Sequence, residues 1–539
     1  MLFTPRESDG GIEALCVIDG SRLYIVEQDA DACMETILKS PCKKRCNNIK
    51  YLYHFGLQRG FEPVNIVFDA EIAAYILNPT SNGYGIAKLA GEYGVTPPAL
   101  DNLLGLHGEL LDACAVFTPL ADKLTGLIEK LGQEKLFYGI ELPLARVLAD
   151  MEHTGFAVDT AGLETFGARM DAEIARLQDD IYALAGGTFN INSPKQLGKV
   201  LFEDLGLPAG KKTKTKSGFS TNADVLEPLA QEYEIVAKIL DYRKVAKLKS
   251  TYVEGLLRVV GPDGRIHTSF QQTLTRTGRI SSVEPNMQNI PIRTELGSEL
   301  RRFFRAAEGK ILLDADYSQI ELRVLAHIAG DENMIAAFSG GQDIHLNTAA
   351  QVFDMPPEFV TPLMRSRAKA VNFGIVYGIG AFSLSKDIGV SVSEADSYIK
   401  NYLSTYAGVK KYMDDTVAAA TENGYVETLF HRRRYLPELA SSNRANREFG
   451  KRVAMNTPIQ GTAADIIKIA MVRVYDRLRR EGLESRLILQ VHDELIVESP
   501  HEEADRAAAV LHEEMEAAVS LSVPMEADVG RGATWLDAK

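Results

Sequence analysis

The chain has 539 residues, of which 45% are hydrophobic and 24% are charged, and its formal net charge is −14. At roughly 100–200 residues per domain this length predicts three or four domains, and the composition excludes disordered and collagen-like classes. No apolar run approaches the roughly 18 residues that a membrane span needs, and the N-terminus lacks a basic region followed by an apolar core. We therefore expect a cytoplasmic protein without a membrane partner.

The negative net charge argues against a nucleic-acid partner unless positive surfaces are local. Residues 195–216 hold six lysines and two acids, a local net charge of +4. This stretch is either a contact to a phosphate backbone or a solvated loop, and composition favours neither. All five cysteines lie in the first 114 residues, and no second pair at zinc-site spacing follows Cys42 and Cys46. We expect reduced cysteines and no structural zinc.

Hydrophobic periodicity divides the chain into a mixed α/β region, a helical region and a C-terminal half in which the chemistry is concentrated. Residues 1–125 form the α/β region, with strands at 14–18 and 23–26 and helices near 69–77 and 109–131. Residues 136–184 are predicted to be helical. The C-terminal half is predicted to contain a strand at 311–315, helices at 361–377 and 462–479, and a hairpin at 486–498.

Two of these elements bring carboxylates to the end of an apolar strand. The strand that begins at Lys310 ends in Asp316, and two apolar strands flank the corner His492-Asp493-Glu494. Each acid by itself is more typical of an ordinary turn residue. Mg²⁺, however, often takes only one or two protein carboxylates together with substrate phosphates. Asp316 and Asp493 are therefore candidate metal ligands.

The predicted helix at 361–377 carries two cations and an aromatic ring on one face. Arg365, Lys369 and Phe373 are spaced at i, i+4 and i+8, which places them in one stripe. Such a stripe suits a nucleoside triphosphate, because the cations bind phosphates and the ring stacks on a base. For this helix alone, a solvated basic face with Phe373 in the core is the alternative interpretation.

Taken together, these segments resemble the three polymerase motifs of family A DNA polymerases, the DNA polymerase I type. The motifs are Asp316-Tyr317-Ser318-Gln319-Ile320-Glu321-Leu322-Arg323, the helix 365–377, and Val491-His492-Asp493-Glu494, in that order. Further matches are Thr277-Gly278-Arg279-Ile280-Ser281-Ser282, Gln288-Asn289-Ile290-Pro291, Asp343-Ile344-His345, and the segment 456–465. The similarity runs from about residue 135 to the C-terminus and is greatest to the large fragments of bacillus-type enzymes.

The resemblance implies an α/β multidomain fold, a right-hand polymerase with palm, fingers and thumb preceded by a vestigial ribonuclease H-like 3′–5′ exonuclease domain. The lysine-rich segment would then lie near the thumb tip. The implied domains are 1–130 (exonuclease-like), 131–275 (thumb with the start of the palm), 276–345 (palm, first part), 346–453 (fingers) and 454–539 (palm, second part).

The resemblance also implies roles for individual residues. Asp316 and Asp493, with Tyr317, would bind two Mg²⁺ ions, Glu494 would be an auxiliary acid, and Lys369 would donate a proton to departing pyrophosphate. The implied nucleotide-binding residues are Arg365, Lys369, Phe373, Tyr377, His345, Glu321 and Gln319. The implied DNA-binding residues are Arg279, Gln288, Asn289, Arg293, Arg452, Asn456, Gln460, His492, Lys211, Lys212 and Lys214.

The implied activity is template-directed addition of deoxynucleotides to a primer, with primer-template DNA and deoxynucleoside triphosphates as partners and a monomeric enzyme. A single-subunit RNA polymerase and a catalytically dead nucleic-acid-binding protein are the alternatives. Glu321 argues against the first, because a bulky acid beneath the sugar leaves no room for a 2′-hydroxyl. The intact metal and phosphate residues argue against the second.

The N-terminal region departs from the family pattern. Residues 67–79 resemble the middle of the exonuclease domain, with Asp69 at one of its metal-binding acids. The Asp-x-Glu motif of the family's opening strand should precede Ile12, and we expect the chain to begin too late to include that motif. The later Tyr-x-x-x-Asp aligns with Glu109 and Ala113. These losses predict an enzyme without proofreading, and we also expect no 5′-nuclease domain.

Overall fold

The computed structural model describes residues 2–8, 11–20, 22–96, 108–209, 214–215, 218–292 and 295–539. Its residues form two compact units, each assembled from segments that are distant in the sequence. Unit 1 comprises Met1–Thr154, Ser269–Val283 and Glu308–Arg531, and unit 2 comprises Gly155–Thr268, Glu284–Ala307 and Gly532–Lys539. Among the described residues, no helix combines the length and apolar character needed to cross a membrane.

Unit 1 begins with a five-stranded sheet in the order β3-β2-β1-β4-β5, in which β1, β2 and β3 are antiparallel neighbours and β4 and β5 are parallel to β1. Its strands are β1 (Leu2–Ser8), β2 (Gly11–Asp19), β3 (Arg22–Val26), β4 (Lys44–Cys46) and β5 (Ile66–Asp69). Strand β1, which was not expected from the sequence, precedes Ile12. Its sequence contains Pro5, which weakens a strand pattern, and it contains no Asp-x-Glu.

Helices pack on this sheet and connect it to the rest of unit 1. The long helix α5 contacts β1 and β2, α1 contacts β2, and α2 packs against α7. These helices are α1 (Ala30–Lys39), α2 (Ile49–Gln58), α3 (Ala70–Leu77), α4 (Ile86–Glu92), α5 (Gly108–Lys130), α6 (Glu134–Leu136), the π-helical turn η1 (Phe137–Glu141) and α7 (Leu142–Thr154).

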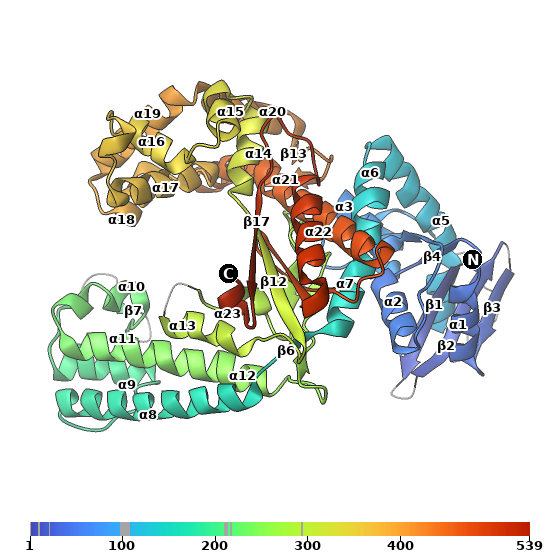
Figure 1. The fold of residues 1–539 in the computed structure, drawn as a ribbon, viewed down its shortest axis with the longest axis horizontal. Helices are drawn as coiled ribbons and strands as arrows, with labels where there is room; N and C mark the ends of the chain where they lie inside the picture. Colours follow the sequence, from blue (N-terminus) through green and yellow to red (C-terminus); the bar gives the residue numbers. More distant parts are fainter. Residues whose placement is uncertain are drawn as a thin grey trace. The chain divides into compact units, whose positions relative to one another are not determined.

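The second sheet of unit 1 has four strands in the order β15-β16-β12-β17 (Figure 1). They are β12 (Lys310–Tyr317), β15 (Arg486–Val491), β16 (Glu494–Pro500) and β17 (Ala527–Gly532), and β12 and β15 both run antiparallel to β16. Helix α22 (Ala504–Glu516) packs on β12, while α7 and the 37-residue helix α21 (Arg444–Arg480) pack on β15. The predicted strand at 311–315 and the predicted hairpin at 486–498 are therefore neighbours in one sheet.

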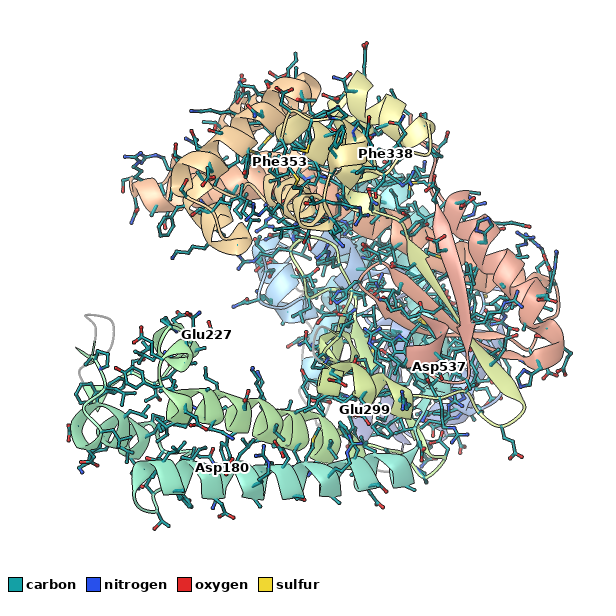
Figure 2. The ribbon with its side chains drawn as sticks, turned by 60° about the vertical axis from the view of Figure 1, so that its left-hand side comes forward. Asp180, Glu227, Glu299, Phe338, Phe353 and Asp537 are labelled. Carbon is teal, nitrogen blue, oxygen red and sulfur yellow. The ribbon has the colours of Figure 1, made fainter. Side chains whose placement is uncertain are left out.

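A group of helices follows β12 and completes unit 1 (Figure 1). The helices are α14 (Ile320–Ala329), α15 (Glu332–Ser339), α16 (Ile344–Val352), α17 (Pro362–Val376), α18 (Ala381–Ile388), α19 (Val392–Thr405) and α20 (Ala407–Asn423). Figure 2 shows Phe338 and Phe353 on these helices. The guanidinium of Arg323 lies 4.7 Å from the centre of the Phe338 ring, and the ring of Phe353 contacts the ring of Tyr398. Aromatic contacts thus hold α14 to α15 and α16 to α19.

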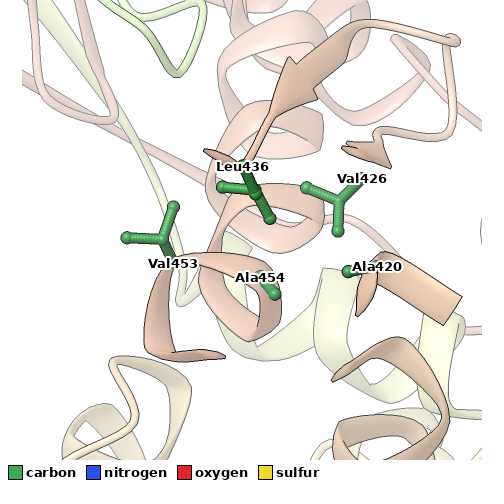
Figure 3. Packing of buried hydrophobic residues seen from close by; sticks show 5 residues of the cluster. All are labelled: Ala420, Val426, Leu436, Val453 and Ala454. Atoms are coloured by element: carbon green, nitrogen blue, oxygen red, sulfur yellow. The ribbon is translucent and has the colours of Figure 1, made fainter. Parts of the chain in front are cut away.

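The start of α21 is fixed by a small apolar cluster. Ala420, Val426, Leu436, Val453 and Ala454 pack together and are all less than 10% exposed (Figure 3). They come from α20, from the strand pair β13 (Tyr425–Glu427) and β14 (Arg433–Tyr435) with the residue that follows it, and from α21. Val453 and Ala454 follow Arg452 directly, so this cluster holds the segment of α21 that carries predicted DNA-binding residues.

Deep in unit 1, four charged side chains form a buried network. Glu141 accepts hydrogen bonds from Lys468 (2.6 Å), Gln272 (2.5 Å) and Arg432, and Arg432 also donates to Asp465 (2.9 Å). The four charged groups are at most 2% exposed. Burial alone would raise the pKa of Glu141, but Lys468 and Arg432 outweigh burial and lower it to about 2. Two acids thus balance two cations where water is excluded.

We predict that Glu141→Ala lowers the free energy of unfolding by about 3–5 kcal/mol, because it leaves a net positive charge buried without compensation. Denaturant unfolding provides the measurement, with Asp415→Ala as the control. Asp415 forms an exposed i, i+4 ion pair with Lys411, so its loss should cost less than about 1 kcal/mol. Removing Lys468 as well, in Glu141→Ala/Lys468→Met, should recover part of the loss. Equal effects of Glu141→Ala and Asp415→Ala would contradict this account.

Unit 2 is mainly helical. Its two long helices, α8 (Thr160–Ala185) and α11 (Glu234–Lys247), pack side by side (Figure 1). The smaller elements are β6 (Phe156–Ala157), α9 (Pro194–Lys199), β7 (Lys214–Thr215), β8 (Gly218–Phe219), α10 (Ala223–Leu226), α12 (Glu254–Leu257), β9 (Arg265–Ile266), α13 (Glu295–Glu299) and α23 (Trp535–Ala538). The buried rings of Phe156, Phe304 and Trp535 form its aromatic centre, with the guanidinium of Arg301 3.9 Å from the Trp535 ring.

Candidate active site

Two predicted metal ligands lie at one edge of the second sheet. Asp316 is the exposed penultimate residue of β12. Asp493 lies in the tight turn between β15 and β16, which His492 enables with a left-handed backbone (φ 52°). The amide of Tyr317 donates to the carbonyl of Asp493 at 3.2 Å, so the turn is bonded to the end of β12. Sheet pairing therefore brings together two acids that are 177 residues apart in the sequence.

The donor set at this edge suits a divalent cation. Asp316 is directly opposite Glu494 in the antiparallel register, and Glu494 is only 3% exposed. Two carboxylates in a cross-strand pair repel each other unless a cation or a proton lies nearby. Among the described residues, no group of three or more His, Cys, Asp or Glu side chains is arranged to hold a metal. A bound Mg²⁺ would thus rely on two carboxylates with main-chain and substrate oxygens, as this ion commonly does.

Tyr317 can contribute only its main chain to such a site. Its hydroxyl donates to the carbonyl of Met515 at 2.6 Å, and burial raises its pKa above the usual range. The ring faces away from Asp316 because neighbouring strand residues point to opposite faces of a sheet. The predicted role of Tyr317 in metal binding therefore narrows to its carbonyl oxygen.

Beside this edge, Glu321 is held by hydrogen bonds to both of its carboxylate oxygens. Oε1 accepts from Arg279 Nη2 at 2.5 Å, and Oε2 accepts from the hydroxyl of Tyr377 at 3.0 Å. Burial, followed by Glu321, raises the pKa of Tyr377 to about 12, and Asp493 acts in the same direction. Tyr377 is therefore a permanent donor at neutral pH. Gln319, with φ 56°, turns the chain from β12 into α14 and so places Glu321 in the first turn of that helix.

The predicted cationic stripe is present on α17. Thr361 caps this helix with a hydrogen bond to the amide of Met364, and Arg365 and Lys369 are both exposed on it. Arg365 Nε donates to Asp343 Oδ2 at 2.7 Å. Asp343 in turn caps α16 by accepting from the amides of His345 and Leu346. One carboxylate thus links Arg365 to the helix that carries His345.

His345 is 2% exposed and neutral at pH 7, because burial lowers its pKa to about 4. Lys369 and Arg365 act in the same direction and Asp343 opposes them. The imidazole lies 5.8 Å from the ring of Phe373, centre to centre. Its Nδ1 is 2.9 Å from the side-chain nitrogen of Asn372. The predicted residues His345, Lys369 and Phe373 are therefore one local group.

The predicted DNA-binding residues of α21 form a single stripe, since Arg452, Asn456 and Gln460 are spaced at i, i+4 and i+8. Arg452 packs against Gly378: a Cβ added to Gly378 would lie only 3.0 Å from the Cγ of Arg452. Gly378 (φ +66°) follows Tyr377, so the stripe adjoins the hydrogen-bonded pair of Tyr377 and Glu321.

The other predicted DNA-binding residues are not all placed. Gln288 and Asn289 lie in the short helix η5 (Met287–Asn289) of unit 2, and Lys214 lies in β7 of the same unit. Arg293, Lys211 and Lys212 lie outside the described residues. All residues predicted for the metal and nucleotide sites belong to unit 1, whereas part of the predicted DNA-binding set belongs to unit 2.

Asp69, the acid expected at an exonuclease-like site, is held by hydrogen bonds within the fold. Asp69 is fully buried, and its Oδ1 and Oδ2 accept from the amides of Ile72 (2.8 Å) and Ile49 (2.6 Å). Burial raises its pKa to about 7. Glu71, the next acid, accepts from the hydroxyl of Thr273 at 2.7 Å. Ala113 lies on α5 and has no carboxylate. Asp69 is thus an N-cap of α3 rather than an open metal ligand.

Sequence reasoning missed several residues that organise this site. Asn372, Thr348 and Tyr406 form hydrogen bonds behind His345, and Asp343 orients Arg365. Only Asn372 gave a signal, since a polar residue between Lys369 and Phe373 interrupts an apolar helix face. Thr348 and Tyr406 belong to no recognisable sequence motif, and only the tertiary structure shows their partners.

Comparison with known proteins confirms the predicted family and fold. The family model for DNA polymerase family A matches residues 160–537. DNA polymerase I of Geobacillus stearothermophilus is 49% identical over 496 residues, and that of Bacillus subtilis (strain 168) is 48% identical over 496 residues. Each match covers 89% of this chain and 56% of the relative, so the chain spans little more than half the length of these curated relatives.

A solved structure extends the match to nearly the whole chain. The POL domain of Pol1 from M. smegmatis, in complex with DNA primer-template and dNTP, superposes with a TM-score of 0.89 at 39% identity. The match covers 98% of this chain and 93% of that one. With the family model matching more than half of its residues, the chain belongs to DNA polymerase family A.

Proposed function

We propose that this chain is a DNA-directed DNA polymerase that adds deoxynucleotides to a primer 3′-hydroxyl and releases pyrophosphate. The observation that carries the proposal is the paired edge of β12 and the β15–β16 turn, where Asp316 and Asp493 lie beside the Glu321 pocket. The proposal is supported by membership of family A and by the structural similarity to a polymerase domain that was solved with primer-template and dNTP. We further propose that the palm, fingers and thumb follow the boundaries expected from the sequence.

Asp316, Asp493 and the carbonyl of Tyr317 would hold two Mg²⁺ ions. When bound, such ions polarise the reacting phosphate and lower the pKa of the attacking hydroxyl. The protein provides a fixed geometry for them, because both acids are anchored to the same sheet. Glu494, buried beside Asp316, adds negative charge that strengthens cation binding.

The nucleotide would lie along α17. Arg365 and Lys369 would bind its phosphates, and Lys369, which has no ion pair to rearrange among the described residues, would donate a proton to the departing pyrophosphate. Phe373 would pack on the nucleotide, and Tyr377 and Glu321 would limit the space at the sugar. Arg279 and the stripe Arg452, Asn456 and Gln460 would contact the minor groove, where every correct base pair presents acceptors.

Primer extension with deoxy- and ribonucleoside triphosphates tests this function against its alternatives. A DNA polymerase extends efficiently only with deoxynucleotides, an RNA polymerase extends with ribonucleotides, and a binding protein extends with neither. Glu321, buried and hydrogen-bonded through both carboxylate oxygens, favours the first outcome, because in the proposed site it would occupy the space that a 2′-hydroxyl needs. Absence of extension with Mg²⁺ and all four deoxynucleotides would refute the proposal.

We predict that the chain does not proofread. Hydrolysis by the family's route needs several carboxylates that hold two Mg²⁺ ions, whereas both Asp69 oxygens accept backbone hydrogen bonds and Glu71 bonds to Thr273. A mismatched, end-labelled primer incubated with Mg²⁺ and no nucleotides should keep its length. Stepwise shortening that persists in Asp316→Ala and disappears in Asp69→Asn would show that an exonuclease site survives.

A further inference from the structure

Behind His345, three buried side chains form a continuous hydrogen-bond chain: Asn372 on α17, Thr348 on α16, and Tyr406 at the junction of α19 and α20. The hydroxyl of Tyr406 is 3.3 Å from Thr348 Oγ1, which donates to Asn372 Oδ1 at 3.1 Å. The amide nitrogen of Asn372 is 2.9 Å from His345 Nδ1. Thr348 and Asn372 are fully buried, Tyr406 is 1% exposed and His345 is 2% exposed. The chain is thus shielded from water along its whole length.

The donors and acceptors in this chain follow in one direction. Asn372 Oδ1 accepts from Thr348, so the other end of the amide, facing His345, is the NH₂ group, which can only donate. Thr348 has a single hydroxyl proton, which goes to Asn372. Tyr406 must therefore be the donor in its contact with Thr348. Each member fixes the orientation of the next.

The direction of the chain determines which nitrogen of His345 carries its proton. Nδ1 accepts from Asn372 and so carries no hydrogen, which leaves the proton of the neutral ring on Nε2. A neutral ring with this tautomer presents N–H, and not a lone pair, on the side away from Asn372. Next to a polyanionic ligand the difference is large, because an N–H binds a phosphate oxygen whereas a lone pair repels it.

We propose that Asn372, oriented by Thr348 and Tyr406, is a positioning residue that keeps His345 as a neutral hydrogen-bond donor, through Nε2, to the phosphates of the incoming nucleotide. The inference rests on the proposed function for the identity of the ligand. The inference also explains why a histidine, and not a third cation, would contact the phosphates beside Arg365 and Lys369. The histidine contributes a directed hydrogen bond without a third positive charge, so pyrophosphate is not held more tightly than its release allows.

The decisive variant is Asn372→Asp, which exchanges the NH₂ donor for a carboxylate acceptor of nearly the same shape. His345 then donates from Nδ1 to Asp, and its neutral form presents a lone pair on Nε2. The other groups near the ring are Asp343 on its own helix, Arg365 and Lys369 on α17, and Thr348 and Tyr406 behind it. None of these groups changes in the variant. The tautomer of His345 and its pH dependence therefore report only the replacement of the Asn372 amide by a carboxylate.

Protein labelled with ¹⁵N-histidine reports the tautomer directly, and His345→Gln identifies the signal. The parent is expected to show Nε2 protonated, and Asn372→Asp to show Nδ1 protonated. In primer extension, the KM for the deoxynucleotide should rise about tenfold in Asn372→Asp at alkaline pH and approach the parent value as acid restores the imidazolium. The parent KM should be independent of pH between about 6 and 8 if its ring stays neutral.

Asn347→Asp is the matched control, because it places the same charge on the helix of His345 at a side chain that bonds to Gln342 instead. Its tautomer and KM should equal those of the parent. Thr348→Val, which frees the Asn372 amide to rotate, should mix the two tautomers, and Thr348→Ser should restore one. An Nδ1-protonated parent, or an unchanged tautomer in Asn372→Asp, overturns the inference. A parent that extends no primer instead refutes the proposed function, because the tautomer measurement requires no activity.

Discussion

Replacing Asp316 or Asp493 with alanine is expected to slow nucleotide addition by at least about a thousandfold while leaving the affinity for primer-template within a few-fold of the parent value. Metal ions at such a site stabilise transition-state charge by several kcal/mol, and each 1.36 kcal/mol of barrier corresponds to about tenfold in rate. Because the proposed role of both acids is to hold metals rather than DNA, catalysis and binding should separate.

The structure explains why neither acid can replace the other. Asp316 extends from β12 and Asp493 from the β15–β16 turn, and the hydrogen bond from Tyr317 to the Asp493 carbonyl fixes their backbones. Glu494 is buried on β16, where it is paired with Asp316 of β12. Moving it into an empty ligand position would break the pairing of β16 with β12.

Single-turnover extension and fluorescence anisotropy with the same primer-template measure the two effects. Asp528→Ala is the matched control, because Asp528 is an exposed aspartate on β17, the strand on the other side of β12. It should extend at the parent rate. Near-normal extension by Asp316→Ala or Asp493→Ala would remove the basis of the active-site assignment.

The strands and acids of this site could be predicted from sequence because the pattern that forms them is local. An apolar run that ends in Asp316, and a three-residue polar corner between two apolar runs, predict a strand end and a hairpin in any fold. The sequence alone could not show that β12 and β16 are paired. That pairing is a contact between distant segments, and the structure shows it, whereas the family resemblance predicted only that Asp316 and Asp493 act together.

The errors and omissions also have local causes. Asp69 directly precedes an apolar helix, which is an N-cap signature, and a family alignment contains no information on that role. β1 was missed because Pro5 interrupts its pattern. The Glu141 network joins residues as much as 327 positions apart, and a buried ion pair leaves no periodic signal in a sequence.

Glu321→Ala is expected to reduce the preference for deoxynucleotides over ribonucleotides by about a hundredfold, because one or two atoms of excluded space in a tight pocket correspond to roughly 10–200-fold in discrimination. Glu321 is 5% exposed and is bonded on one oxygen to Arg279 and on the other to Tyr377. Both bonds oppose a rotation that would make room for a 2′-hydroxyl. We therefore expect the sugar selectivity to depend on these three residues rather than on Glu321 alone.

This geometry orders a series of variants. Glu321→Gln keeps the bulk of the side chain and one acceptor, so it should stay selective, whereas Tyr377→Phe removes one bond and should relax discrimination by less than about tenfold. The ratio of kcat/KM for a deoxynucleotide to that for its ribonucleotide, measured in single-nucleotide primer extension, gives each value. Asn347→Asp serves as the control, because the side chain of Asn347 bonds to Gln342 rather than to Glu321, Arg279 or Tyr377. An unchanged ratio in Glu321→Ala would mean that the sugar is read elsewhere, and a larger effect of Tyr377→Phe than of Glu321→Ala would make the ring, and not the carboxylate, the residue that excludes the 2′-hydroxyl.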